Sequence, residues 1–344
     1  MGGRWDGREY GSELRSWGLV IPGTLTGVTR TLLSRRWVLC REWNHWWFRQ
    51  VPPHALALFR MTFGMFLLLY WGRYALHVPL LMGDAGIAFP LFLDRYPWLQ
   101  TPTVPVAWVL YTLLLLAFLL IALGAWMRGA ALSALLLLTY IWVTSMHPHW
   151  LTMEHLTMVF LVLLLFSGAD RWLSLRMWWR HGSPFAWEAV SICPQRCIAL
   201  QITATYLGVG WQKAWLPDWQ SGEILAYSLM SVWGTVPAFA IAQANIPLWV
   251  YDLIVLQVKY MEFLLPFGLW IPRVRLFFMG WAFLFHVLIA LLLNIWWFLV
   301  LVPSYVLFFK PEEVFQVLRA ARAADRCGSD SSGKQAPPSG PSHS

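Results

Sequence analysis

The amino-acid sequence predicts an all-α fold, a polytopic transmembrane helical bundle with about eight spanning helices and additional interfacial helices. Hydrophobic residues make up 58% of the 344 residues and charged residues only 12%, about half the charged share of soluble domains. Such a chain has too few polar groups to cover a soluble surface. The 25 tryptophans also suit membrane interfaces, where the ring is buried and the indole N–H stays hydrated.

The first segment, residues 1–53, is expected to lie in the cytoplasm and to contain an interfacial helix. Arg35–Gln50 reads RRWVLCREWNHWWFRQ, and this mixture of arginine and aromatic residues is typical of a helix in the headgroup layer. Pro52 and Pro53 end that helix because the residue before a proline is disfavoured in the helical conformation.

Apolar runs of about 16 residues or more then recur between short polar segments, as expected for helices in hydrocarbon. The runs show no alternation of apolar and polar residues, which disfavours a β-barrel. The predicted spans are Ala55–Leu76, Val104–Leu123, Ala130–Met146, Leu151–Phe166, Ile198–Leu216, Ile246–Trp270 and two more within Leu276–Phe309. This last stretch would make a rod of about 50 Å, so we expect a turn between Ile289 and Asn294.

The segment Glu223–Ala244 is only moderately apolar, and the charges decide its interpretation. If it does not span, most of the 25 lysines and arginines lie on one side, as the positive-inside rule requires. Pro217–Asn245 is therefore expected at the outer surface as an interfacial or re-entrant segment. Both termini of this integral protein of the cell membrane are then cytoplasmic.

The chain thus divides into three predicted parts. Residues 1–53 form the N-terminal segment, residues 54–309 the transmembrane domain, and residues 310–344 a short cytoplasmic amphipathic piece with a disordered tail. The tail is rich in Ser, Pro and Gly, a composition that cannot build a packed core.

The net charge of +8 does not indicate a nucleic-acid partner, because the basic residues lie between apolar runs and at both ends rather than along one stripe. The expected partner is the lipid bilayer. The four cysteines all fall in segments predicted to be cytoplasmic, so disulfides are not expected. They are Cys40, Cys193, Cys197 and Cys327.

Several ionisable residues fall within the predicted spans, where a charge is costly and marks a candidate functional site. They are Arg60, His155, Lys213, Lys259, Glu262 and His286. The predicted topology puts His155, Lys213 and His286 at one depth, about 5 to 12 Å below the outer surface. A lysine in a shared cavity there is a candidate general base, and a histidine beside it orients a substrate or holds a proton. These three are the predicted catalytic residues.

Each of these residues also has a purely structural interpretation. Lys213 can extend its ammonium group to the outer headgroups, and the two histidines can form hydrogen bonds between helices. Lys259 and Glu262 are three residues apart on one helix and can neutralise each other. Arg60 can extend to the cytoplasmic headgroups, while Gly64 lets another helix approach closely.

No metal site is predicted. His147, His149 and His155 lack the spacing of a helical ligand set, and no cysteine lies near them. The C-x-x-x-C spacing of Cys193 and Cys197 matches neither a redox motif nor a zinc quartet.

Several motifs between Ala55 and Phe309 resemble, in order, those of a known family. They are ALALFRMTFG, LMGDAGIAFP, MEHLTM, QITATYLGVGWQKAWLPDWQSGE and FLFHVLIA. The fourth is the most specific, and it holds Tyr206, Gly210, Lys213, Trp219 and Gly222. On these residues the chain resembles the HTTM (horizontally transferred transmembrane) family and, within it, the membrane domain of vitamin K-dependent γ-glutamyl carboxylase.

The resemblance implies a site at the same three residues. In the carboxylases the lysine matching Lys213 is taken to be the base that deprotonates vitamin K hydroquinone, and histidines similar to His155 and His286 belong to its site. It implies vitamin K hydroquinone or another quinol as cofactor, and a secreted peptide or a small lipid-soluble substrate as partner. The carboxylases carry a large extracytoplasmic domain where only 35 residues follow Phe309 here, so carboxylation of a docked protein is not expected.

The leading hypothesis is therefore a membrane enzyme in which Lys213 acts as general base on a quinol or carboxylate at the outer face. One alternative is a non-catalytic membrane partner in secreted-peptide maturation or immunity. Another is a transporter with Lys213, Lys259 and Glu262 along its path, which the mostly apolar cytoplasmic halves of the spans disfavour.

Overall fold

The computed structural model describes residues 40–86, 90, 94–145 and 152–320. The chain divides into two units, Met1–Arg49 and Gln50–Ser344. In the first unit, residues 40–48 form a helix on which Trp43 and Phe48 are exposed. A helix thus lies within the segment predicted to form one, and its place at a membrane surface stays a prediction.

The second unit consists of helices joined by shorter elements. The longer helices are α3 (His54–Gly72), α5 (Val104–Leu123), α6 (Met127–Ser145), α7 (Thr152–Leu165), α9 (Cys193–Trp215), α12 (Leu248–Trp270), α13 (Arg275–Leu293) and the 3₁₀ helix η3 (Trp296–Phe308). The shorter ones are η1 (Ala75–His77), α4 (Val78–Leu81), α8 (Leu175–His181), η2 (Pro217–Trp219), α10 (Glu223–Leu229) and α11 (Val236–Gln243). Residues 311–320 are also helical. The single strand pair in the described residues is β1 (Gln50–Val51), antiparallel to β2 (Val190–Ser191), so the all-α class is confirmed.

Five of these helices are long and apolar enough to cross a membrane, namely α3, α5, α6, α12 and α13. Helices α7 and η3 are apolar but have only 14 and 13 residues. Helix α9 has 23 residues but carries several glutamines and Lys213 along its length, which lowers its hydropathy. The structure therefore supports a polytopic helical membrane protein with five candidate spans in the described residues. The predicted number of about eight requires α7, α9 and η3 to cross as well.

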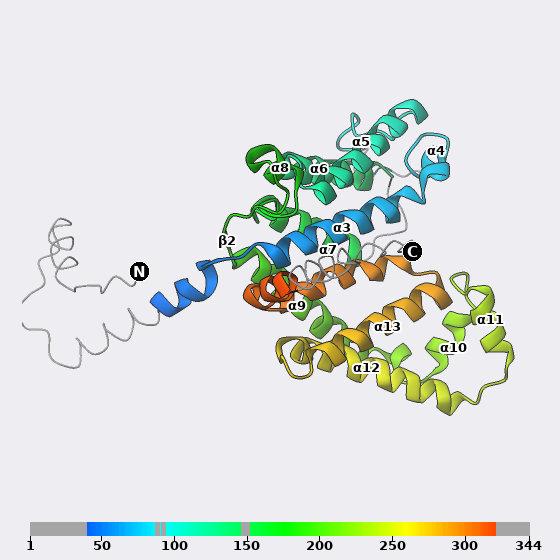
Figure 1. The fold of residues 1–344 in the computed structure, drawn as a ribbon. Helices are drawn as coiled ribbons and strands as arrows, with labels where there is room; N and C mark the ends of the chain where they lie inside the picture. The colour runs from blue at the N-terminus through cyan, green and yellow to red at the C-terminus, as the bar shows by residue number, and fades with distance from the viewer. Residues whose placement is uncertain (1–39, 87–89, 91–93, 146–151, 321–344) are drawn as a thin grey trace, which may run out of the picture. The chain divides into compact units, whose positions relative to one another are not determined.

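Helix α3 lies in the middle of the second unit, with α5 and α6 on one side and the α12 and α13 pair on the other (Figure 1). The Tyr111 hydroxyl of α5 donates to the Trp71 carbonyl of α3 at 2.8 Å. Gly64 of α3 lies against α5, and a Cβ atom there would come within 2.7 Å of the Ala122 nitrogen. The prediction that Gly64 lets another helix approach closely is confirmed.

One interpretation of the sequence had Arg60 extending to the membrane surface, and the structure contradicts it. Its side chain is fully buried, and its guanidinium donates to the carbonyls of Ile121 at 2.9 Å, Ala122 at 2.8 Å and Leu173 at 2.6 Å. The last carbonyls of a helix lack the usual partners within it. The Gly124 amide donates to the Ile121 carbonyl at 3.1 Å, Arg60 supplies a further donor to this carbonyl and to that of Ala122, and a cation is favourable at a helix C-terminus. Arg60 is therefore a buried cap of α5.

The apolar stretch Leu276–Phe309 folds as two helical elements, as predicted. Helix α13 ends before Asn294, which has φ 55°, the left-handed conformation that often ends helices. The turn was predicted between Ile289 and Asn294, so it lies at the end of the predicted interval. Helix η3 then returns beside α13, and the Phe298 and His286 rings stack with centroids 5.8 Å apart.

The segment Pro217–Asn245 contains no α-helix long enough to span a membrane, in agreement with the prediction. Helices α10 and α11 have 7 and 8 residues, so the longer one measures about 12 Å against a hydrocarbon core of about 30 Å. The Thr235 amide donates to the Leu292 carbonyl at 2.9 Å and its hydroxyl to the Leu291 carbonyl at 2.8 Å, which attaches the segment to the end of α13. Its place on the outer side stays a prediction.

Candidate functional site

One face of α9 carries the residues from which the candidate site is built. Tyr206, Gly210 and Lys213 follow one another at intervals of four and three residues, the spacing that puts side chains on one face of a helix. They continue the buried stripe of α9, which includes Ile198 and Ile202. A Cβ atom at Gly210 would lie 3.1 Å from the amide nitrogen of Phe263, so the absence of a side chain lets α12 approach this face.

Lys213 forms an ion pair with Glu262 of α12. The Lys213 Nζ donates to Glu262 Oε1 at 2.6 Å, and the two side chains are only 14% and 7% exposed. Glu262 Oε2 is buried and has no hydrogen-bond partner in the described residues. Because water does not screen this pair fully, its electrostatic interaction is stronger than that of a surface pair, and the carboxylate keeps one acceptor free.

Trp219 covers the ammonium group. Its ring centroid lies 4.1 Å from Lys213 Nζ, a distance at which a cation is attracted to the face of an aromatic ring. Lys259 Nζ donates to the Trp219 carbonyl at 2.9 Å, and Gly222 donates its amide to Asp252 Oδ1 at 2.6 Å. Both contacts attach the η2 turn to α12. The spacing of Lys259 and Glu262 had suggested that they pair with each other. In the structure Lys259 contacts Trp219 and Glu262 pairs with Lys213 instead.

His286 belongs to a second set of contacts on the same face of α9. The Tyr206 hydroxyl lies 2.7 Å from His286 Nε2 and 2.9 Å from the Tyr305 hydroxyl of η3. If Tyr305 donates to Tyr206 and Tyr206 donates to Nε2, both contacts are satisfied and Nδ1 carries the ring proton. Nδ1 is itself buried and has no partner in the described part of the chain.

These two sets of contacts form one group, which we call the α9 polar cluster. It consists of Tyr206, Lys213, Glu262, His286 and Tyr305. Tyr206 and Lys213 are seven residues apart on α9, about two helical turns. Both sets of contacts therefore lie on one face of this helix inside the bundle.

The third predicted residue, His155, lies elsewhere. Its side chain is exposed on α7, where Val159, Val162 and Phe166 are exposed at the following intervals of four, three and four residues. The buried stripe of α7 contains Leu156 and Phe160 instead. The structure thus places Lys213 on the buried face of α9 and His286 against Tyr206 on the same face, about two turns away. It leaves His155 on the exposed stripe of α7.

Two members of the cluster were not among the predicted catalytic residues. Glu262 was among the ionisable candidates, as a partner of Lys259 or part of a transport path, but it was not assigned to Lys213. Its position four residues after Val258 puts it on the buried stripe of α12. Tyr305 carries no sequence signal, since it is a single tyrosine within an apolar stretch. Tyr206 was part of the quoted motif but had no assigned role.

The cysteines and histidines do not form a metal site in the described residues. No group of three or more His, Cys, Asp or Glu side chains lies together there, and His147 and His149 fall outside the described ranges. The Sγ atoms of Cys193 and Cys197 are 3.8 Å apart, and these two cysteines and Cys40 are free. Cys327 also lies outside the described residues.

A comparison with known protein families shows to which family this chain belongs. The HTTM domain matches residues 48–312, which is most of the sequence and includes the whole α9 polar cluster and His155. The chain belongs to the HTTM family. Neither curated proteins nor solved structures match this HTTM protein. Membership of the family identifies the chain as an HTTM-domain helical membrane protein. The contacts of the α9 polar cluster are the basis for its proposed role.

Proposed function

We propose that this HTTM protein is a membrane-embedded enzyme in which the pair of Lys213 and Glu262 accepts a proton from a lipid-soluble substrate. The observation that carries the proposal is the buried contact of 2.6 Å between the two side chains, next to a carboxylate oxygen that has no partner in the described residues. Inside hydrocarbon such a pair is costly, and pairs of this kind mark sites of proton transfer or ligand binding.

The proton inventory of the pair supports this role. When the two groups together carry no net charge, they hold one proton fewer than the amine and the carboxyl can bind. A substrate hydroxyl that donates its proton leaves an oxyanion beside a pair that is then positively charged. The Trp219 ring stabilises the ammonium form of Lys213. The positive pair therefore stabilises the substrate oxyanion, and the Trp219 ring stabilises the ammonium group.

A quinol is the substrate class that best fits these surroundings. It dissolves in the bilayer, its hydroxyl is weakly acidic, and its ring suits the aromatic surface that Trp219 supplies. The resemblance to the carboxylases supports the same class, with a carboxylate-bearing substrate as the second choice. We place the site near the outer face, with both termini in the cytoplasm, because this orientation leaves most basic residues on the inner side.

His286 and the two tyrosines are proposed as positioning residues. The contacts of Tyr206 with His286 and Tyr305 hold α9, α13 and η3 together about two helical turns before Lys213. They fix the rotation of α9 and therefore the direction of the Lys213 side chain. The role predicted for His155 stays a prediction, and its exposed position suits contact with a substrate that approaches α7 from outside.

The test uses purified protein in lipid nanodiscs with reduced vitamin K as the probe. Wild-type protein is expected to bind the quinol and to accelerate its reaction with O₂, which yields the quinone and hydrogen peroxide and is followed by oxygen uptake. Lys213→Met should lower the quinol-dependent rate by about 100-fold or more, the usual contribution of a general base. Lys310→Met, which removes an exposed lysine outside the site, is the control and should retain the rate.

Two outcomes would contradict the proposal. Oxygen uptake at the wild-type rate in Lys213→Met would exclude proton transfer to the pair and would favour the non-catalytic membrane partner. Absence of quinol binding in the wild type would exclude the substrate class.

A further inference from the structure

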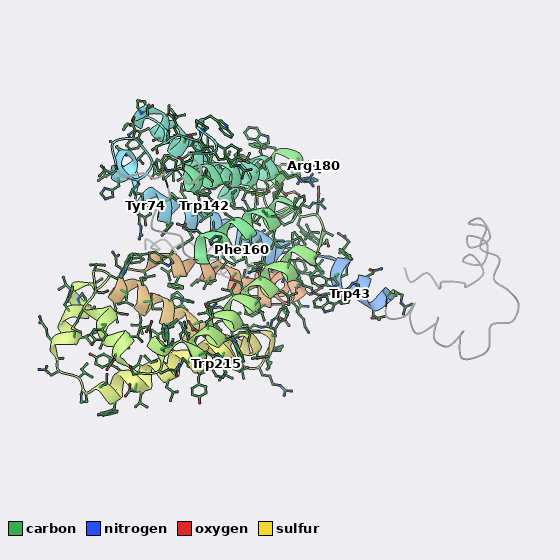
Figure 2. The ribbon with its side chains drawn as sticks, turned by 180° about the vertical axis from the view of Figure 1, so that it is seen from behind. Trp43, Tyr74, Trp142, Phe160, Arg180 and Trp215 are labelled. Carbon is green, nitrogen blue, oxygen red and sulfur yellow. The ribbon has the colours of Figure 1, made fainter. Side chains whose placement is uncertain are left out.

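A second site lies away from the α9 polar cluster, in a cavity of about 70 Å³ between α3, α6, α7 and η3. One water molecule needs about 10–15 Å³, so this cavity admits a group of several heavy atoms. Aromatic side chains and one acidic side chain line it, among them Tyr70, Trp71, Tyr74, Trp142, Glu154 and Trp297. Figure 2 shows Tyr74 and Trp142 near each other where α3 and α6 end.

The cavity is separate from the site described above. None of the five residues of the α9 polar cluster lines it. Trp297 faces the cavity, while the next residue, Phe298, stacks on His286. Helix η3 therefore presents neighbouring residues to the two sites, and a ligand in the cavity does not contact the ion pair of Lys213.

Glu154 is the acidic group of the cavity, and no side chain in the described residues pairs with its charge. Its side chain is half-buried, and in the described residues it forms neither a hydrogen bond nor an ion pair. Glu154 lies in the first turn of α7, where the helix dipole favours a negative charge. An ionised carboxylate that is half-buried against aromatic rings is costly unless a cation comes to it.

Arg73 does not supply that cation. Its guanidinium lies over the rings of Tyr70 and Tyr74, 4.8 Å from each centroid, and donates to the Tyr74 hydroxyl at 2.7 Å. The arginine is thus held by these two rings and not by Glu154. Its contacts also show that the faces of these tyrosines bind a cation.

We propose that the cavity binds an organic ammonium cation, with the charge beside Glu154 and its alkyl groups against the aromatic rings. Aromatic rings around a carboxylate suit a quaternary or alkylated ammonium, because the ring faces attract the charge and also bury the alkyl groups. An inorganic cation does not suit this lining, which offers few oxygen ligands. The cation comes either as a free amine or as the headgroup of a lipid, and both present the same chemistry. The proposal stands apart from the proton-transfer function.

The test measures binding of radiolabelled choline to the full-length protein in nanodiscs of phosphatidylglycerol, a lipid without an ammonium group. Choline should bind at least about tenfold more tightly than 3,3-dimethyl-1-butanol, its uncharged isostere. Glu154→Gln and Trp142→Leu should each weaken choline binding by a similar factor. Glu223→Gln removes an exposed carboxylate on α10 and should leave binding unchanged.

The source of the cation is tested in the same assay. Nanodiscs that contain phosphatidylcholine should weaken choline binding if a lipid headgroup occupies the cavity, and should leave it unchanged if the ligand is a free amine. Equal binding of choline and its isostere to the wild type would overturn the proposal without any variant. Absence of choline binding in phosphatidylglycerol, or wild-type affinity in Glu154→Gln, would also overturn it.

Discussion

Gly210 of α9 lies so close to Phe263 of α12 that a Cβ atom at position 210 would come within 3.1 Å of the Phe263 amide nitrogen. Lys213 is one turn further along α9, and Glu262 is the residue before Phe263. The contact of 2.6 Å between Lys213 and Glu262 therefore depends on how closely these two helices pack. The missing side chain at Gly210 thus controls the geometry of the proposed site.

Gly210→Leu should push α9 and α12 apart. We expect it to lower the free energy of unfolding by about 1–3 kcal/mol, the usual cost of overpacking, and to weaken the ion pair. Thermal unfolding in detergent measures the change. Gly208→Leu on the same helix is the matched control, because nothing lies within 4 Å of a Cβ atom there. Equal losses in the two variants would contradict the close contact.

Lys213 and Glu262 should be energetically coupled. Lys213→Met or Glu262→Gln alone leaves one buried charge without its partner and should cost about 3–5 kcal/mol. The double variant removes both charges, so its loss should be clearly smaller than the sum of the two single losses. Chemical unfolding of all four proteins forms a double-mutant cycle. Additive losses would show that the two groups do not interact.

Arg60→Met should be strongly destabilising. The change removes the guanidinium donor of the Ala122 and Leu173 carbonyls and leaves the Ile121 carbonyl with the Gly124 amide alone. We expect a loss of about 3 kcal/mol or more. Arg95→Met is the control, because Arg95 is exposed. Thermal unfolding measures both variants. A small effect at Arg60, like that at Arg95, would contradict its role as a buried cap.

The contribution of Glu188 to stability should depend on pH. The hydrogen bond from His181 and the charges of Arg180 and Arg171 lower the pKa of the Glu188 carboxyl. Because the pKa of Glu188 is lower in the folded state, its carboxylate stabilises the fold fully above the pKa of an unfolded glutamate, about 4.3. This stabilisation is lost as the pH falls through the pKa of Glu188 in the folded state. The difference in melting temperature between wild type and Glu188→Gln should therefore be present at pH 7 and shrink below about pH 4.3. A difference that grows as the pH falls would contradict this sign.

Sequence patterns were sufficient to predict that the chain is helical and which residues of the α9 motif share one face of their helix. Long apolar runs form helices because hydrocarbon leaves backbone groups no partner outside their own segment. The positions of Tyr206, Gly210 and Lys213 on one helix face also follow from spacing alone. The helix lengths, however, show five candidate spans in the described residues, since α7 and η3 are short and α9 is more polar.

The partners of the charged residues could not be predicted in the same way. Local spacing favours a pair between Lys259 and Glu262, yet Glu262 lies on the buried stripe of α12 and pairs with Lys213 across the helix contact. Arg60 looked suited to the membrane surface, but its position beside the end of α5 made it a cap. His155 had the depth expected of a site residue but faces outward from α7.

The sequence by itself determined that this chain is a helical membrane protein, and it determined which residues share a face of α9. The tertiary structure alone decided that Lys213 meets Glu262, that His286 meets Tyr206, and that Glu154 borders an aromatic cavity. The physical reason is the range of the forces involved. Insertion and helix formation depend on the free energy of each segment in hydrocarbon, whereas the partner of a side chain depends on the rotation and spacing of whole helices, which only their packing sets.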